Sequence, residues 1–149
     1  MMLEAASETR ELRAVVSEGA GSRWVGEDLA RPGGGAQHLL QTGVQTIAYG
    51  ATAVFSGDAP SPRLQNAAPR ISQPTFLIYA DDGVDTEDLD PRYYRELAGP
   101  KQIWETGTGH IRAATDRPAE YERRVVAFLD RALLPRCAER IASGALCAA

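Results

Sequence analysis

The segment Thr75-Phe-Leu-Ile-Tyr79 constrains the fold more than any other, because it is apolar throughout and directly follows Pro74. A strand without a polar face has to be covered on both sides, which is typical of a parallel sheet lying between layers of helices. Two further strands are predicted, at residues 12–16 and at residues 102–106, where β-branched and aromatic side chains are mixed. Together the three segments predict a small sheet.

Helical patterns occupy the stretches before, between and after these strands. The expected helices cover residues 2–8, 22–30, 36–57 (as one or two helices), 61–68, 90–97 and 116–134. Strands that alternate with helices pair in parallel through right-handed crossovers, and the helices then cover the sheet. The sequence therefore predicts an α/β fold of about three parallel strands flanked by helices. In such a fold the loops that follow the strands gather at one edge, where ligands bind.

His110 lies on one of these loops, directly after the strand at residues 102–106. Gly107 and Gly109 precede His110 in this loop. Glycine allows the positive φ values that a sharp turn at a ligand site often needs. We expect a reachable imidazole at the carboxyl end of a strand, a placement suited to a general base as well as to a purely structural role. The other loops at this edge are residues 17–21, with a serine, and the acidic residues 81–88.

Composition excludes several classes of protein. The 149 residues are 44% apolar and 24% charged, as in an ordinary single globular domain. The net charge of −4, with the cationic side chains spread among acidic ones, argues against a nucleic-acid surface. No run of eighteen apolar residues predicts a membrane span. The first residues lack the pattern of a secretory signal, so a cytoplasmic location is expected.

The sequence predicts neither a metal site nor a bound cofactor. Cys137 and Cys147 are expected to stay reduced, and both are far along the chain from the two histidines, so no metal-ligand spacing occurs. The acidic loop lacks the glycine and distal glutamate positions of an EF-hand. Gly19-Ala-Gly21 follows a strand, but Trp24 stands where a dinucleotide-binding loop needs its third glycine.

The order of a strand-end acid followed by a strand-end histidine resembles the C-terminal half of the α/β-hydrolase superfamily. The matching pieces are Pro74 to Tyr79 for the acid strand, Trp104 to His110 for the histidine loop, and Glu120 to Leu133 for the closing helix. The resemblance implies that residues 1–134 form the C-terminal portion of such a domain, with a cap or lid at residues 22–70. Residues 135–149 would be a C-terminal tail.

The resemblance also implies roles for individual residues. His110 would be the general base of a serine hydrolase that acts on a small-molecule substrate with an ester or related acyl bond. Asp82 is the preferred acid, and Asp81 and Asp85 are alternatives. Each of these aspartates also fits a solvated acidic turn. No cofactor would be needed.

The sequence departs from the family at the nucleophile, since Gly-x-Ser-x-Gly occurs nowhere in it. Ser17 follows a strand, but Val15 occupies a position where the elbow needs a small residue. The expectation is therefore that the chain begins just after the nucleophile and that the first half of the sheet is missing. A sheet cut in this way would expose an edge that favours self-association or a partner chain.

Two functions follow from these observations. The first is a serine-esterase-like enzyme, or the part of one that supplies His110 and its acid. The second is a truncated or degenerate hydrolase that acts without catalysis, as a binding or interaction module. The missing elbow favours the second, and the placement of His110 favours the first.

Overall fold

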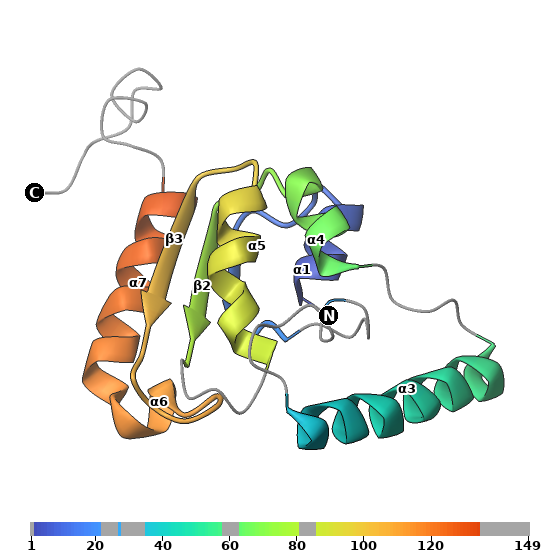
Figure 1. Cartoon of the computed structure of the whole chain (residues 1–149). Helices are drawn as coiled ribbons and strands as arrows, with labels where there is room; N and C mark the ends of the chain where they lie inside the picture. The colour runs from blue at the N-terminus through green and yellow to red at the C-terminus, as the bar shows by residue number, and fades with distance from the viewer. Residues whose placement is uncertain (1, 22–26, 28–34, 58–62, 81–85, 135–149) are drawn as a thin grey trace, which may run out of the picture.

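The computed structural model describes residues 2–21, 27, 35–57, 63–80 and 86–134 (Figure 1). Within them, β1 (Val15–Glu18), β2 (Thr75–Tyr79) and β3 (Lys101–Glu105) form one sheet in the order β1-β2-β3. Both pairings are parallel, with Leu77 of β2 opposite Ser17 on one side and Ile103 on the other. The predicted α/β fold with three parallel strands is confirmed.

The central strand β2 is buried on both of its faces. Phe76 and Ile78 point to one side and Leu77 to the other, and all three are 0% exposed. Alternate side chains of a strand point to opposite faces, so an all-apolar strand has to lie between two apolar layers. The composition of this segment therefore determines the three-layer arrangement of the molecule.

One helical layer packs on the Leu77 face of the sheet. It consists of α1 (Met2–Glu8), α4 (Leu64–Ala67), the 3-10 turn η1 (Ala68–Arg70) and α5 (Asp90–Glu96). Leu3, Ile71 and Tyr93 from these elements are almost completely buried with Leu77 and Val15. Most of the apolar core lies on this side.

The other layer packs on the Phe76 face of the sheet. It consists of α6 (Ala113–Asp116) and α7 (Pro118–Leu133), which lies along β3 in Figure 1. The ring centroids of Phe76 and Phe128 are 5.4 Å apart, and Trp104 packs against both the Tyr121 ring and the guanidinium of Arg124. Trp104 is 6% exposed, and it belongs to the core of this layer.

The longest helix, α3 (Ala36–Ser56), is one continuous element of 21 residues. The sequence left open whether one or two helices cover this stretch, and Gly43 and Gly50 do not interrupt the single helix. Gly57 ends α3 with a left-handed backbone at φ 71°, a conformation that glycine adopts without strain. In Figure 1, α3 projects away from the sheet and its two helical layers.

Most element boundaries lie close to the predicted ones. β1 begins three residues later than predicted, at Val15, and the predicted last helix is preceded by the separate turn α6. The helix predicted at residues 22–30 lies outside the described residues except for residue 27. In the part of the chain that the structure describes, no helix is both long and apolar enough to cross a bilayer.

Gly99 gives a direct test of this packing. A Cβ atom at Gly99 would contact the Ser72 carbonyl, at 2.6 Å from its carbon, and would lie 2.8 Å from the Gln73 oxygen. Because backbone atoms cannot move aside as a side chain can, Gly99→Ala should lower the free energy of unfolding by about 2 kcal/mol or more in urea denaturation. The control Gly35→Ala, where no atom lies within 4 Å of the added Cβ, should change stability by less than about 1 kcal/mol. Equal stability of the wild type and Gly99→Ala would contradict this packing.

Candidate acid-base site

The loops that follow the three strands meet at the carboxyl edge of the sheet. Gly19 follows β1, Ala80 follows β2, and the loop from Thr106 to His110 follows β3. Glu87, in the 3-10 turn η2 (Thr86–Leu89), lies between them. We call Gly19, Glu87, Asp90 and His110 the carboxylate-imidazole site.

The loop that carries His110 is fixed by hydrogen bonds close to the end of β3. The Thr106 amide donates to the Tyr79 carbonyl at 2.9 Å, and the Thr106 and Thr108 hydroxyls lie 2.9 Å apart. The turn closes where the Arg112 amide donates to the Gly109 carbonyl at 3.1 Å. The His110 side chain is 41% exposed, so the predicted reachable position is found.

Two residues of this loop have a positive φ. Gly107 has φ 59°, as its type allows, but Gly109 does not share this conformation. Ile111 has φ 47° instead, immediately after His110. A β-branched residue in this region is strained, and such strain is often found where a functional side chain is held in place. The sequence therefore indicated a tight turn but not which residues carry its unusual backbone.

Glu87 is the carboxylate that contacts the imidazole. Its Oε1 lies against the His110 Nδ1, and its Oε2 accepts a hydrogen bond from the Ala80 amide at 2.7 Å. Only 2% of the Glu87 side chain is exposed. Both carboxylate oxygens are therefore engaged, and the link to Ala80 holds the group at the end of β2.

Gly19 lies against the side chains of Glu87 and His110. Its φ is 66°, and its amide donates to the Ile78 carbonyl at 3.0 Å. A Cβ atom there would lie 3.1 Å from Glu87 Oε1 and 3.2 Å from His110 Cε1. The contact between the carboxylate and the imidazole therefore depends on a residue without a side chain at this position.

Glu18, the last residue of β1, connects the same edge to the second helical layer. Its Oε1 accepts a hydrogen bond from the Ala113 amide at 3.1 Å, at the first residue of α6. Burial first, and then the neighbouring Glu18 carboxylate, raise the pKa of the Tyr121 hydroxyl. Glu18 thus fixes the chain where it leaves the histidine loop.

Asp90 is a second buried acid next to Glu87. It is 0% exposed, and neither of its carboxyl oxygens makes a regular hydrogen bond to another described residue. Burial, and then the negative charge of Glu87, raise its pKa to about 8, although the nearby Ala20 amide lowers it in part. The folded protein therefore favours the neutral form of Asp90 at pH 7.

This geometry determines which nitrogen of His110 can accept a proton. An ionised carboxylate only accepts hydrogen bonds, so the Nδ1 that contacts Glu87 has to carry the hydrogen. The Nε2 of a neutral imidazole then has the lone pair and can act as a base. Once it has taken a proton, the buried carboxylate stabilises the imidazolium.

The sequence identified His110 but not the other members of this site. The preferred acid Asp82 and its alternatives Asp81 and Asp85 lie outside the described residues. Ser17 lies within β1 and is 8% exposed, two residues before Gly19 and so about 7 Å from it along the strand. No local signal distinguishes Glu87 from its acidic neighbours, because its role depends on where the turn η2 places it.

Among residues 2–21, 27, 35–57, 63–80 and 86–134, no three His, Cys, Asp or Glu side chains are grouped so that they could hold an ion. Cys137 and Cys147 lie outside these ranges.

Comparison with known proteins gives a structural neighbour only. No family model matches the sequence, and no curated protein is significantly similar to it. Among solved structures, the fold is similar to that of an esterase from Pyrococcus furiosus, with a TM-score of 0.58 and 22% identity. The match covers 88% of this chain and 49% of the esterase, so the chain spans about half the length of that protein. At this identity the likeness shows the fold alone, an α/β arrangement that corresponds to about half of that esterase.

The raised pKa of Asp90 predicts a specific dependence of stability on pH. Between about pH 4 and pH 8 the unfolded chain has lost this proton and the folded chain keeps it, so folding takes up a proton. The free energy of unfolding contributed by Asp90 therefore falls as the pH rises, by about 1.4 kcal/mol per pH unit. In Asp90→Asn this dependence is absent.

Urea denaturation at pH 5 and pH 7 measures this effect. The stability of the wild type relative to Asp90→Asn should fall by about 3 kcal/mol between these two pH values. The matched control is Asp116→Asn, because Arg112 lowers the pKa of Asp116 and its carboxylate stays ionised over this range. A difference between wild type and Asp90→Asn that does not vary with pH would contradict the burial of a neutral carboxyl.

Proposed function

We propose that this chain supplies the acid and the base of a serine-hydrolase site that acts on ester or related acyl bonds. In this proposal His110 is the general base and Glu87 is the acid that orients it, in place of the Asp82 expected from the sequence. The contact of the buried Glu87 carboxylate with His110 Nδ1 at the carboxyl edge of a parallel sheet carries the proposal. The hydrolase-like fold supports it.

The chemistry follows from the orientation of the imidazole. His110 Nε2 removes the proton from a serine hydroxyl while its oxygen attacks the acyl carbon of the substrate. The same proton then passes from Nε2 to the departing alcohol oxygen, and water repeats the sequence to release the acid. Glu87 stays ionised throughout and stabilises the imidazolium at each step. Neither a metal nor a cofactor takes part.

The nucleophile in this proposal is a serine. Ser17 is the candidate within β1, but it lies inside the strand with most of its surface covered. A nucleophile elbow exposes its serine on a strained turn after a strand. We therefore assign the attacking serine to a segment outside the described residues, with Ser17 as the alternative among the described residues.

The rest of the chain has roles in this proposal as well. Residues 1–134 would be the C-terminal portion of a hydrolase domain, with residues 22–70, including α3, as a cap and residues 135–149 as a tail. The substrate would be a small molecule with an ester or related acyl bond.

A non-catalytic role is the second candidate, and one observation favours it. β1 is an edge strand, and beyond it no further strand pairs among the described residues. An unpaired parallel edge can accept another strand or chain, so the fold could serve as an interaction module without turnover. The two candidates differ in whether His110 is needed for hydrolysis.

Hydrolysis of a p-nitrophenyl ester tests the catalytic role. His110→Ala should abolish turnover, and Glu87→Gln should lower kcat by about a thousandfold or more, because an amide cannot stabilise the imidazolium. Asp82→Asn is the matched control and should keep activity close to that of the wild type. The reverse pattern, with loss in Asp82→Asn and not in Glu87→Gln, would return the acid to Asp82.

A fluorophosphonate probe identifies the serine in the same preparation. We expect the probe to label a serine other than Ser17 in the wild type, and we expect this labelling to be lost in His110→Ala. Labelling of Ser17 would place the nucleophile within β1. Turnover that is unchanged in His110→Ala would refute the proposed base, and a wild-type chain without turnover or labelling would favour the non-catalytic role.

A further inference from the structure

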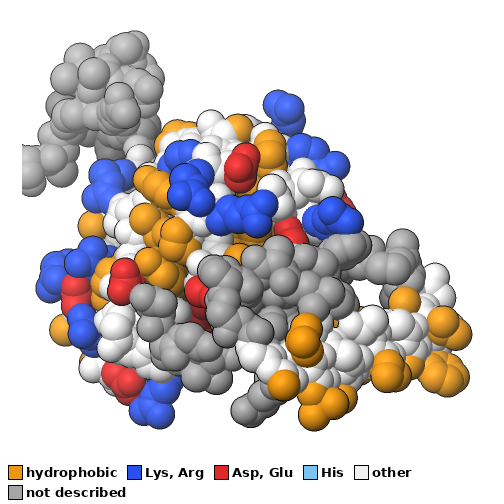
Figure 2. All heavy atoms as spheres, viewed as in Figure 1, with side chains coloured by type: hydrophobic (Ala, Val, Ile, Leu, Met, Phe, Trp, Pro, Cys, Tyr) orange, Lys and Arg blue, Asp and Glu red, His pale blue; other side chains and the backbone are white. Residues whose placement is uncertain are grey.

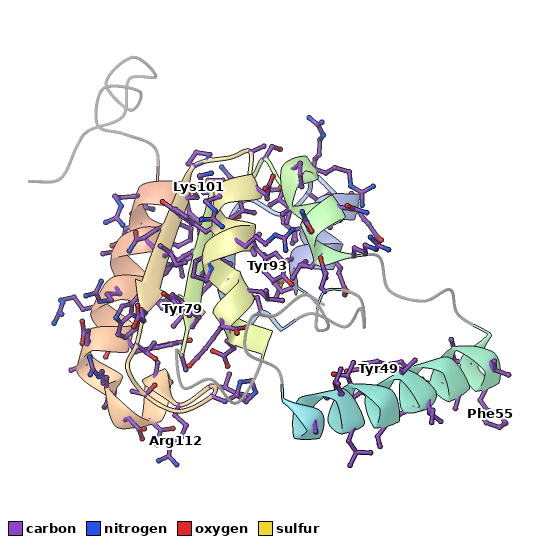
Figure 3. All side chains as sticks on the ribbon, in the orientation of Figure 1. Tyr49, Phe55, Tyr79, Tyr93, Lys101 and Arg112 are labelled. Carbon is purple, nitrogen blue, oxygen red and sulfur yellow. The ribbon has the colours of Figure 1, made fainter. Side chains whose placement is uncertain are left out.

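The helix α3 presents an unusually apolar face to solvent. Its large apolar side chains are mostly exposed, with Ile47 at 74%, Val54 at 80% and Phe55 at 90%. Figure 2 shows hydrophobic atoms along the lower edge of α3 and at its far end, and Figure 3 shows Phe55 at that end. Thr42, in contrast, is only 2% exposed. The helix therefore leaves a broad apolar surface in water, which is unfavourable unless something covers it.

Charge excludes one class of occupant. The chain has sixteen Lys and Arg and twenty Asp and Glu residues, yet none of them lies in α3. A helix that lies on a lipid surface usually has Lys and Arg on its polar face to contact the headgroups, and α3 has none. Two copies of α3, in contrast, can approach each other without like-charge repulsion and without burying a charge.

The residues on the apolar face repeat at spacings of four and three, which keeps them in one seam along the helix. In this seam small and large side chains alternate. The seam consists of Ala36, Leu40, Gly43, Ile47, Gly50 and Val54. All six are exposed, and an added Cβ at Gly43 or Gly50 would meet no atom within 4 Å. Each of the two glycines therefore leaves a space between larger side chains that a side chain of another helix can fill.

This alternation is complementary to itself when two copies of α3 run antiparallel. With the twofold axis at the level of residue 45, a seam residue of one copy faces the residue of the other copy that lies equally far from position 45 in the opposite direction. Leu40 of one copy then faces Gly50 of the other, Gly43 faces Ile47, and Ala36 faces Val54. Every large side chain meets a small one, as ridges fitting into grooves require. The antiparallel arrangement also pairs opposite ends of the two helix dipoles.

We propose that the seam of α3 is the contact between two copies of this chain, paired antiparallel around residue 45. At a rise of 1.5 Å per residue the 21-residue helix provides a contact about 31 Å long. This surface is separate from the edge of β1 and does not depend on the chemistry of His110. The dimer would cover Leu40, Ile47 and Val54 of the seam, which the isolated chain leaves in water.

Analytical ultracentrifugation of the full chain tests the proposal. The wild type should sediment at twice the monomer mass of 16.0 kDa, and Ile47→Glu should raise the dissociation constant at least about 100-fold, because it buries unpaired charges in the seam. The control Thr52→Glu adds the same charge on the other side of α3, at an exposed position, and should stay dimeric. Circular dichroism verifies that both variants keep their helix.

A swap of two residues tests the antiparallel register itself. Gly43→Leu alone places a leucine against Ile47 of the second copy, and Ile47→Gly alone leaves two glycines facing each other, so each should weaken the dimer at least about tenfold. The double variant Gly43→Leu, Ile47→Gly restores a large residue opposite a small one. Its dissociation constant should return to within about tenfold of that of the wild type.

Three outcomes would overturn the proposal. A wild-type chain that stays monomeric, including one that instead co-sediments with phosphatidylcholine vesicles, would assign the seam to another occupant. A dimer that Ile47→Glu leaves intact would place the contact elsewhere, as at the edge of β1. Failure of the double variant to recover dimerisation, when each single variant has lost it, would exclude the antiparallel register.

Discussion

Burial of β2 on both faces is the constraint on which the rest of the structure depends. Because Phe76, Leu77 and Ile78 have no contact with water, the chain has to supply a helical layer for each face, and it does so with α1, α4 and α5 on one side and α7 on the other. The crossovers that place these helices also make the strands parallel. The carboxyl ends of all three strands consequently lie at one edge, and the carboxylate-imidazole site is built there.

The fold was largely predictable from the sequence because its signals are local. The apolar run at Thr75–Tyr79 and the stripe from Tyr121 to Ala132 each indicate a type of element and a covered face, and the structure confirms both, whereas Leu133 at the end of the stripe is exposed. The late start of β1 was less predictable, since residues 12–16 are more apolar than the observed strand Val15–Glu18, which ends in a serine and a glutamate. The outward orientation of α3 could not be predicted either, because the pattern of a helix indicates an apolar face but not what covers it.

The site was only half predictable, for a physical reason. His110 directly follows a strand and a glycine turn, so its position could be inferred from its neighbours in sequence. Glu87 is reached only after a loop and the turn η2, and the hydrogen bond from the Ala80 amide holds its carboxylate at the end of β2. Gly19 contributes by having no side chain where the side chains of Glu87 and His110 meet, although both residues lie much further along the chain. Asp90 lies next to Glu87, and burial raises its pKa to about 8.

The Glu87 carboxylate fixes the tautomer of His110, and NMR spectroscopy of the imidazole nitrogens measures directly which nitrogen carries the hydrogen. Long-range proton–nitrogen correlation spectra of the neutral ring, assigned with a His38→Gln variant, distinguish a protonated Nδ1 from a protonated Nε2. We expect that His110 carries its proton on Nδ1 in the wild type and that this preference is lost in Glu87→Gln. A wild-type His110 with its proton on Nε2, or a tautomer that Glu87→Gln leaves unchanged, would contradict it.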